Sequence, residues 1–120
     1  MMAEANKIPV AIYTRKSIEV AEHMKIKDNW ELISVFADIG ISGSSVEKRP
    51  GLTKMLRDCR EGKIKIIIVK DIAQLSRNTV DALRCLKSLN ELGVSVYVES
   101  EEKELTITYI DEENFVPILR

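Results

Sequence analysis

The chain has 120 residues, 45% of them hydrophobic and 31% charged, and this composition is typical of a single globular domain with one core. No apolar run approaches the roughly 18–20 residues of a membrane-spanning helix, and the polar start lacks the apolar stretch of a signal peptide, so we expect a cytoplasmic protein without membrane contact. Cys59 and Cys85 have no metal-ligand spacing and fall on the apolar faces of expected helices, so we expect buried, reduced thiols and no metal site.

Charge is distributed unevenly along the chain. The formal net charge is −1, but residues 48–87 hold 11 Lys or Arg against 4 Asp or Glu, whereas the remaining residues hold 7 against 15. A basic centre between acidic ends is typical of a protein that presents one face to phosphate groups. Solvated helix faces produce similar clusters, so charge alone leaves both interpretations open.

Strand patterns alternate with helix patterns along the chain. Short apolar, β-branched runs predict strands at residues 7–13, 30–37, 64–69, 94–98 and 105–110. Apolar stripes at helical spacing predict helices at residues 18–29, from Pro50 to just before Gly62, and at residues 79–92. The alternation predicts an α/β fold of three layers: a mostly parallel central sheet of four to five strands, helices on both faces, and a last strand that is antiparallel at an edge.

Three polar segments follow predicted strands, at residues 15–17, 38–50 and 71–78. Ligands of open α/β sheets bind beyond the carboxyl ends of the strands, so the three segments are expected to meet at one site. The middle segment is rich in glycine and serine, and connections of this length more often carry function than not.

A serine hydroxyl and three cations would meet at that site: Ser17, Arg15, Arg49 and Arg77. An alcohol that attacks a phosphodiester needs its charge-rich transition state neutralised, and the planar fork of arginine fits two phosphate oxygens. A serine after a strand, taken alone, is more often a turn residue or a helix cap. The combination therefore carries the functional interpretation.

Four motifs stand at the ends of these strands and at the start of the next helix. They are Tyr13-Thr14-Arg15-Lys16-Ser17, Asp38-Ile39-Gly40-Ile41-Ser42-Gly43, Arg49-Pro50-Gly51-Leu52 and Leu75-Ser76-Arg77-Asn78. In this order and at much of this spacing, the chain from about Ile8 to Val98 resembles the catalytic domain of serine site-specific recombinases, which include resolvases, invertases and large serine recombinases. The resemblance implies that residues 1–120 form one resolvase-type catalytic domain, without the DNA-binding domain of a full-length recombinase.

The resemblance also implies a reaction. Ser17 would displace a deoxyribose 3′-oxygen and hold the 5′-phosphate covalently, without metal or other cofactor, while DNA strands are exchanged within a dimer or tetramer of the full-length protein. Arg15, Arg49 and Arg77 would bind the scissile phosphate. Supporting roles are expected for Tyr13, Asp38, Ser42 and Gln74. Contacts to the DNA backbone are expected on the basic side of the second helix, from Lys54, Arg57 and Arg60.

The sequence also departs from the family pattern. Ala73 and Gln74 stand where the family usually has Asp-Arg or Ser-Arg, and loss of one charged donor costs on the order of 10²- to 10³-fold in rate. The segment between Ser17 and Trp30 is shorter than in the family. Two explanations stay open: a catalytic domain separated from a larger recombinase, or an eroded relative that serves as a DNA-binding or oligomerisation module without covalent chemistry.

Two other classes of function compete with these. A small α/β module could bind an anionic ligand or a protein partner without covalent chemistry. A phosphoacceptor domain would need acidic residues at the strand ends, and Asp38 and Asp71 are the candidates. We rank it last, because the arginines near Ser17 favour phosphate over a metal ion.

Overall fold

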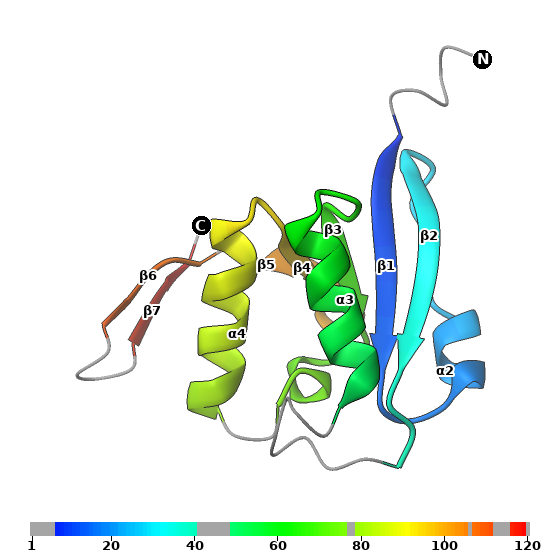
Figure 1. Cartoon of the computed structure of the whole chain (residues 1–120), viewed down its shortest axis with the longest axis horizontal. Helices are drawn as coiled ribbons and strands as arrows, with labels where there is room; N and C mark the ends of the chain where they lie inside the picture. The colour runs from blue at the N-terminus through cyan, green and yellow to red at the C-terminus, as the bar shows by residue number, and fades with distance from the viewer. Residues whose placement is uncertain (1–6, 41–48, 77–78, 106, 112–115, 120) are drawn as a thin grey trace.

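The computed structural model describes residues 7–40, 49–76, 79–105, 107–111 and 116–119. The main sheet contains, in spatial order, β2 (Trp30–Ala37), β1 (Ile8–Thr14), β3 (Ile66–Val69), β4 (Ser95–Val98) and β5 (Lys103–Leu105) (Figure 1). The first four run parallel, and β5 is antiparallel to β4 at the edge. The helices between the strands are α2 (Ile18–Glu22), α3 (Pro50–Arg60) and α4 (Thr79–Glu91). The expected α/β fold with a five-stranded, mostly parallel sheet is confirmed.

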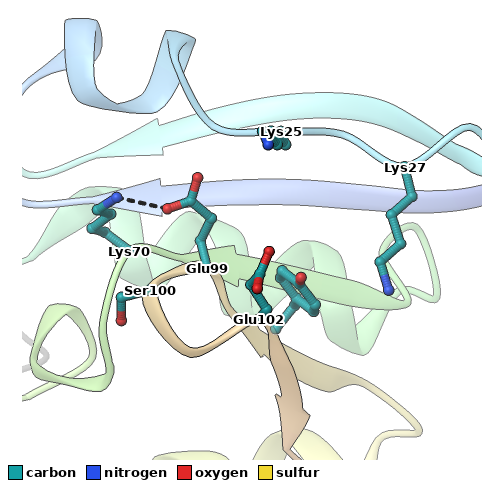
Figure 2. Close-up of a pocket in the computed structure, with 7 residues that line it drawn as sticks. Lys25, Lys27, Lys70, Glu99, Ser100 and Glu102 are labelled. Carbon is teal, nitrogen blue, oxygen red and sulfur yellow. Dashed lines mark hydrogen bonds and ion pairs between the residues drawn. The ribbon is translucent and has the colours of Figure 1, made fainter.

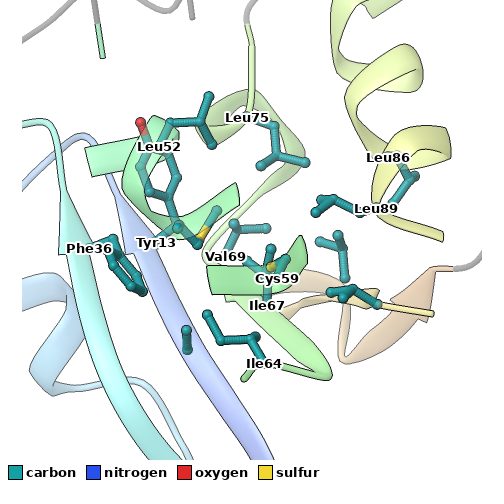
Figure 3. Close-up of a cluster of buried hydrophobic side chains, with 14 of the residues drawn as sticks. Tyr13, Phe36, Leu52, Cys59, Ile64, Ile67, Val69, Leu75, Leu86 and Leu89 are labelled. Atoms are coloured by element: carbon teal, nitrogen blue, oxygen red, sulfur yellow. The ribbon is translucent and has the colours of Figure 1, made fainter. Parts of the chain in front are cut away.

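Alternation along β1 builds a core on each face of the sheet. Ala11 and Tyr13 belong to one buried cluster, whereas Val10 and Ile12 belong to the other. Helices α3 and α4 lie side by side over the first face, and Figure 3 shows their side chains packed against those of β1 and β3. The short helix α2 and the segment after it cover the second face. The expectation of helices on both faces is thus confirmed, although the two coverings are unequal.

The helix expected at residues 18–29 is wrong in length, because α2 ends at Glu22. Its apolar stripe is too thin to support a longer helix: Ala21 is its buried residue, and Ile18 is 49% exposed. The chain instead continues without regular secondary structure, and Met24 and Ile26 pack into the core on this face of the sheet. The Nζ atom of Lys27 lies 4.9 Å from the centroid of the Tyr97 ring.

The strand expected at residues 105–110 is wrong as a single element. A short helical turn, η3 (Glu99–Glu101), and Glu102 in the left-handed conformation reverse the chain early, so β5 begins at Lys103. The chain then enters a separate antiparallel hairpin of β6 (Ile107–Asp111) and β7 (Val116–Leu119), which lies beside α4 (Figure 1). The alternating pattern from Leu105 to Tyr109 does not reveal where the chain leaves one sheet for another.

Both cysteines are free thiols, as expected, and Cys59 is buried whereas Cys85 is partly buried. Burial raises the pKa of Cys59 to about 12 and that of Cys85 to about 11, so both stay protonated at neutral pH. Within the described residues, no helix combines the length and apolar character that a membrane crossing requires.

Candidate functional site at the carboxyl end of β1

The chain leaving β1 is fastened to the turn that follows β3. This turn is η2 (Ile72–Gln74), a single turn of 3-10 helix. The backbone N–H of Arg15 donates to Gln74 Oε1 at 2.8 Å, and Arg15 Nε donates to the backbone carbonyl of Gln74 at 3.0 Å. The Nη2 of Arg15 donates to the carbonyl of Ala73. These hydrogen bonds therefore bring together two segments of the site that are 58 or 59 residues apart in the sequence.

Arg49 stands at the N-terminus of α3 and is 1% exposed. Its Nε donates to the Tyr13 hydroxyl at 3.1 Å, its Nη2 to the carbonyl of Gln74 at 2.8 Å, and its Nη1 to the carbonyl of Leu75. A buried guanidinium is tolerated only when its donors are satisfied, and three carbonyl or hydroxyl oxygens supply that here. Arg15 and Arg49 thus share one acceptor, the carbonyl of Gln74.

Asp38 lies just past the end of β2 and caps the N-terminus of α3, although it is 13 residues away in the sequence. Its Oδ1 accepts from the backbone N–H of Gly51 at 2.7 Å, and its Oδ2 accepts from that of Leu52 at 2.9 Å. The N-cap residue, Arg49, makes no side-chain cap of its own, so the buried carboxylate satisfies these helix N–H groups and faces the positive end of the helix. Asp38 is therefore a structural acceptor in the site and more than a strand-end turn residue.

Tyr13 joins Asp38 to Arg49. Its hydroxyl donates to Asp38 Oδ2 at 2.7 Å while it accepts from Arg49 Nε. Burial raises the pKa of Tyr13 well above its ordinary value, and the hydrogen bond to Asp38 raises it further, against the opposing effect of Arg49. Tyr13 is therefore protonated at neutral pH and donates to Asp38.

Ser17 is the N-cap of α2, and its Oγ accepts from the backbone N–H of Val20 at 3.1 Å. The residue is partly exposed and lies two positions after Arg15. Capping uses a lone pair of the oxygen and leaves the hydroxyl proton to be removed. The cap and the predicted nucleophile are thus compatible roles for the same side chain.

The family description "Resolvase, N terminal domain" matches residues 11–116. The chain belongs to this family. No protein in a search of curated sequences matches this resolvase-type domain.

Solved structures of recombinase catalytic domains share the fold of this resolvase-type domain. The N-terminal catalytic domain of TP901-1 integrase is 24% identical, with a TM-score of 0.66 over 80% of each chain. A resolvase family site-specific recombinase from Streptococcus pneumoniae is 26% identical, with a TM-score of 0.64 over 82% of this chain and 76% of the other. The C-terminal catalytic domain of ISC1926 TnpA, an IS607-like serine recombinase, is 20% identical, with a TM-score of 0.63 over 76% of this chain and 69% of the other.

The structure of the resolvase-type domain brings together five of the eleven residues that the sequence singled out, whereas the hydrogen bond of Ser17 goes to its own helix. Hydrogen bonds join these five into one network: Tyr13, Arg15, Asp38, Arg49 and Gln74. Arg77 and Ser42 lie outside the described residues. The three predicted DNA contacts, Lys54, Arg57 and Arg60, are all exposed on α3.

Two features of the network have no signal in the sequence. One is the capping of α3 by Asp38, which lies 13 and 14 residues before the N–H groups that it binds. The other is the use of backbone carbonyls from residues 73–75 as arginine acceptors. Neither feature depends on a residue type at a fixed spacing, so neither can be predicted from a sequence motif.

A hollow of about 460 Å³ lies elsewhere, between the segment after α2 and the ends of β3 and β4 (Figure 2). Its charged lining mixes both signs, and Lys70 Nζ pairs with Glu99 Oε1 at 2.7 Å. It contains none of the residues in the network. Across the described residues, no group of three His, Cys, Asp or Glu side chains is placed to hold a metal ion.

Gly51 allows Asp38 to approach α3 closely. A Cβ at this position would lie 2.7 Å from the backbone oxygen of Ala37 and 2.9 Å from Asp38 Oδ1. Helix propensity alone would make Gly51→Ala stabilising by up to about 1 kcal/mol. Because the clash involves a backbone carbonyl, we expect the opposite sign and a loss of about 1–3 kcal/mol in the free energy of unfolding.

Chemical denaturation of the wild type and Gly51→Ala measures this difference. Gly40→Ala shows the cost of backbone strain without a clash, since no heavy atom lies within 4 Å of a Cβ there and the cost arises from its φ of +74° alone. That strain is worth about 1–2 kcal/mol. A stabilised Gly51→Ala protein would contradict the close approach of Asp38 to the helix.

Proposed function

We propose that this domain cleaves and rejoins DNA through a covalent link between Ser17 and a 5′-phosphate. The Ser17 Oγ–phosphorus bond forms as the bond from phosphorus to the deoxyribose 3′-oxygen breaks, and the proton of the hydroxyl ends on that 3′-oxygen. The phosphoserine diester conserves the energy of the broken bond, so the reverse attack can reseal the strand without a nucleotide. Strand exchange would take place in a dimer or tetramer of the full-length protein.

The observation that carries the proposal is the position of two guanidinium groups beside the strand that leads into Ser17. Arg15 follows β1 directly, and Arg49 reaches the same carbonyl of Gln74 from α3. Preorganised cations of this kind stabilise the charge that develops on a phosphorane-like transition state. Arg77 would add a third, and exposed cations on α3 would contact the flanking DNA backbone.

Ser17→Ala is expected to abolish a covalent protein–DNA adduct that the wild type forms. The substrate is a duplex with a nick placed so that the cleaved strand diffuses away and the adduct accumulates, and the readout is a shifted band on a denaturing gel. Ser100→Ala, at an exposed serine far along the chain, is the control and is expected to leave the adduct unchanged. Absence of an adduct from the wild type, or its survival in Ser17→Ala, would refute the proposed chemistry.

A second candidate is a domain that binds DNA without covalent chemistry. It is favoured by Gln74, an uncharged residue at a position where the family usually has arginine, and by the enclosure of Arg49. This candidate predicts DNA binding without adduct. Each of Lys54→Ala, Arg57→Ala and Arg60→Ala should then reduce the slope of log affinity against log salt concentration by about 1, as loss of one phosphate contact does.

A further inference from the structure

The carbonyl of Gln74 is the point where the two described arginines of the site meet. Nε of Arg15 donates to it at 3.0 Å, and Nη2 of Arg49 donates to it at 2.8 Å. The carbonyl of Ala73 accepts a further bond from Arg15, and the carbonyl of Leu75 accepts one from Arg49. Two like charges that would repel each other are therefore bridged by one short run of backbone oxygens.

The side chain of Gln74 holds that run in place. It is 3% exposed, and its Oε1 accepts from the backbone N–H of Arg15 at 2.8 Å. An N–H group can only donate, so the position requires an acceptor oxygen, which arginine does not have. The residue found here is thus fitted to its contact and is more than a neutral remnant of a lost cation.

The local backbone explains why the carbonyls face the arginines. The N–H of Gln74 bonds to the carbonyl of Asp71, and the N–H of Leu75 bonds to that of Ile72, which closes the turn η2 on itself. The carbonyls of residues 73–75 come last in this turn, and helix ends leave such groups without partners inside the helix. The arginines supply those partners.

We infer that Gln74 is a positioning residue, which fixes the spacing of Arg15 and Arg49 through its side-chain oxygen and its backbone carbonyl. This inference rests on the proposed function, because it concerns how the phosphate site is held. Arg15 is partly exposed and Arg49 is enclosed, so Arg15 is the arginine that meets a phosphate first. The hydrogen bond from the Arg15 N–H to the Gln74 side chain fixes the backbone position from which the Arg15 side chain extends.

Amide hydrogen exchange tests the positioning role without DNA. In the wild type, the Arg15 amide is expected to be protected although β1 ends at Thr14. Gln74→Met keeps the length of the side chain and removes the acceptor, so exchange at Arg15 should become roughly 10- to 100-fold faster. At about 1.4 kcal/mol per tenfold this corresponds to about 1.4–2.8 kcal/mol, within the cost of leaving a buried donor without its acceptor. Exchange at Tyr13, within β1, should stay unchanged. Gln74→Glu retains an acceptor oxygen and should restore the protection.

The same variants connect position to chemistry. In Gln74→Met, the rate of adduct formation at saturating DNA should fall at least tenfold, whereas the dissociation constant for an uncleaved duplex should change less than twofold. Ile72→Val, in the same turn, alters no hydrogen bond and serves as the control for both measurements. If the wild type forms no adduct, the exchange data still decide the positioning role, so the two proposals fail separately.

The inference is overturned if the Arg15 amide is unprotected in the wild type, or if Gln74→Met leaves its exchange unchanged. It is also overturned if exchange accelerates equally at Tyr13 and Arg15, because a uniform change marks global destabilisation. If Gln74→Met does not fold, the test is amide exchange at Arg15 in the wild type and in Gln74→Glu. Protection in both proteins supports the positioning role, and its absence in either contradicts it.

Discussion

Replacing Asp38 with alanine is expected to lower the free energy of unfolding by about 3–5 kcal/mol, the range found when one partner of a buried charged network is removed. The carboxylate accepts three hydrogen bonds, from Tyr13, Gly51 and Leu52, at 2.7, 2.7 and 2.9 Å. Alanine would leave these donors buried without their acceptor. It would also remove the negative charge that is hydrogen-bonded to Tyr13, the acceptor of Arg49 Nε.

Urea denaturation followed by the fluorescence of Trp30, the single tryptophan, measures the effect. Asp28→Ala is the matched control, because Asp28 is exposed at the entry to β2, where surface substitutions stay within about 0.5 kcal/mol. Asp38→Asn keeps one acceptor oxygen and should lie between the two. Equal stability of Asp38→Ala and Asp28→Ala would show that the carboxylate does not hold α3.

Replacing Gln74 with the arginine that the family usually carries is expected to lower the free energy of unfolding by about 2–4 kcal/mol and to leave adduct formation no faster. From the sequence alone one would expect faster adduct formation, since arginine would restore a cation that the family usually has at this position. In the fold, however, the new guanidinium would enter a buried position beside Arg15 and Arg49 and could not accept from the Arg15 N–H.

Ala73→Arg provides the control for Gln74→Arg. Ala73 is exposed and directly precedes Gln74, so the variant adds the same charge without burying it. Its unfolding free energy should stay within about 1 kcal/mol of the wild type, as for other surface substitutions. A Gln74→Arg protein that is as stable as the wild type and faster in adduct formation would show that the pocket can rearrange to accept a third cation.

The extent to which the sequence predicted the fold differs between elements. Strands β1 and β2 and helix α3 carry dense apolar patterns and proper boundary residues, and their observed limits lie close to the expected ones. The predicted length of the helix after Ser17 and the predicted single strand after Glu104 were wrong. A thin apolar stripe does not show where a helix ends, and alternation does not show where a strand leaves the sheet.

The site divides in the same way. The sequence placed Ser17, Arg15 and Arg49 at strand and helix ends, since arginine and serine in these motifs are recognisable as residue types. It gave no indication of what the arginines contact. Arg49 was expected to face a phosphate, but in the structure its guanidinium donates hydrogen bonds to the Tyr13 hydroxyl and to the backbone carbonyls of Gln74 and Leu75.

The sequence alone determined the α/β class of this protein, the order of its main strands and helices, and its family, because these follow from hydrophobic periodicity and from motifs a few residues long. Only the tertiary structure decided that Asp38 caps α3, that the 73–75 carbonyls hold both arginines, and that Gln74 serves as an acceptor. These contacts join residues 13 to 59 positions apart, and several of them use backbone atoms that every residue carries. Local pattern cannot encode such pairings, since they exist only once the carboxyl ends of the strands have come together.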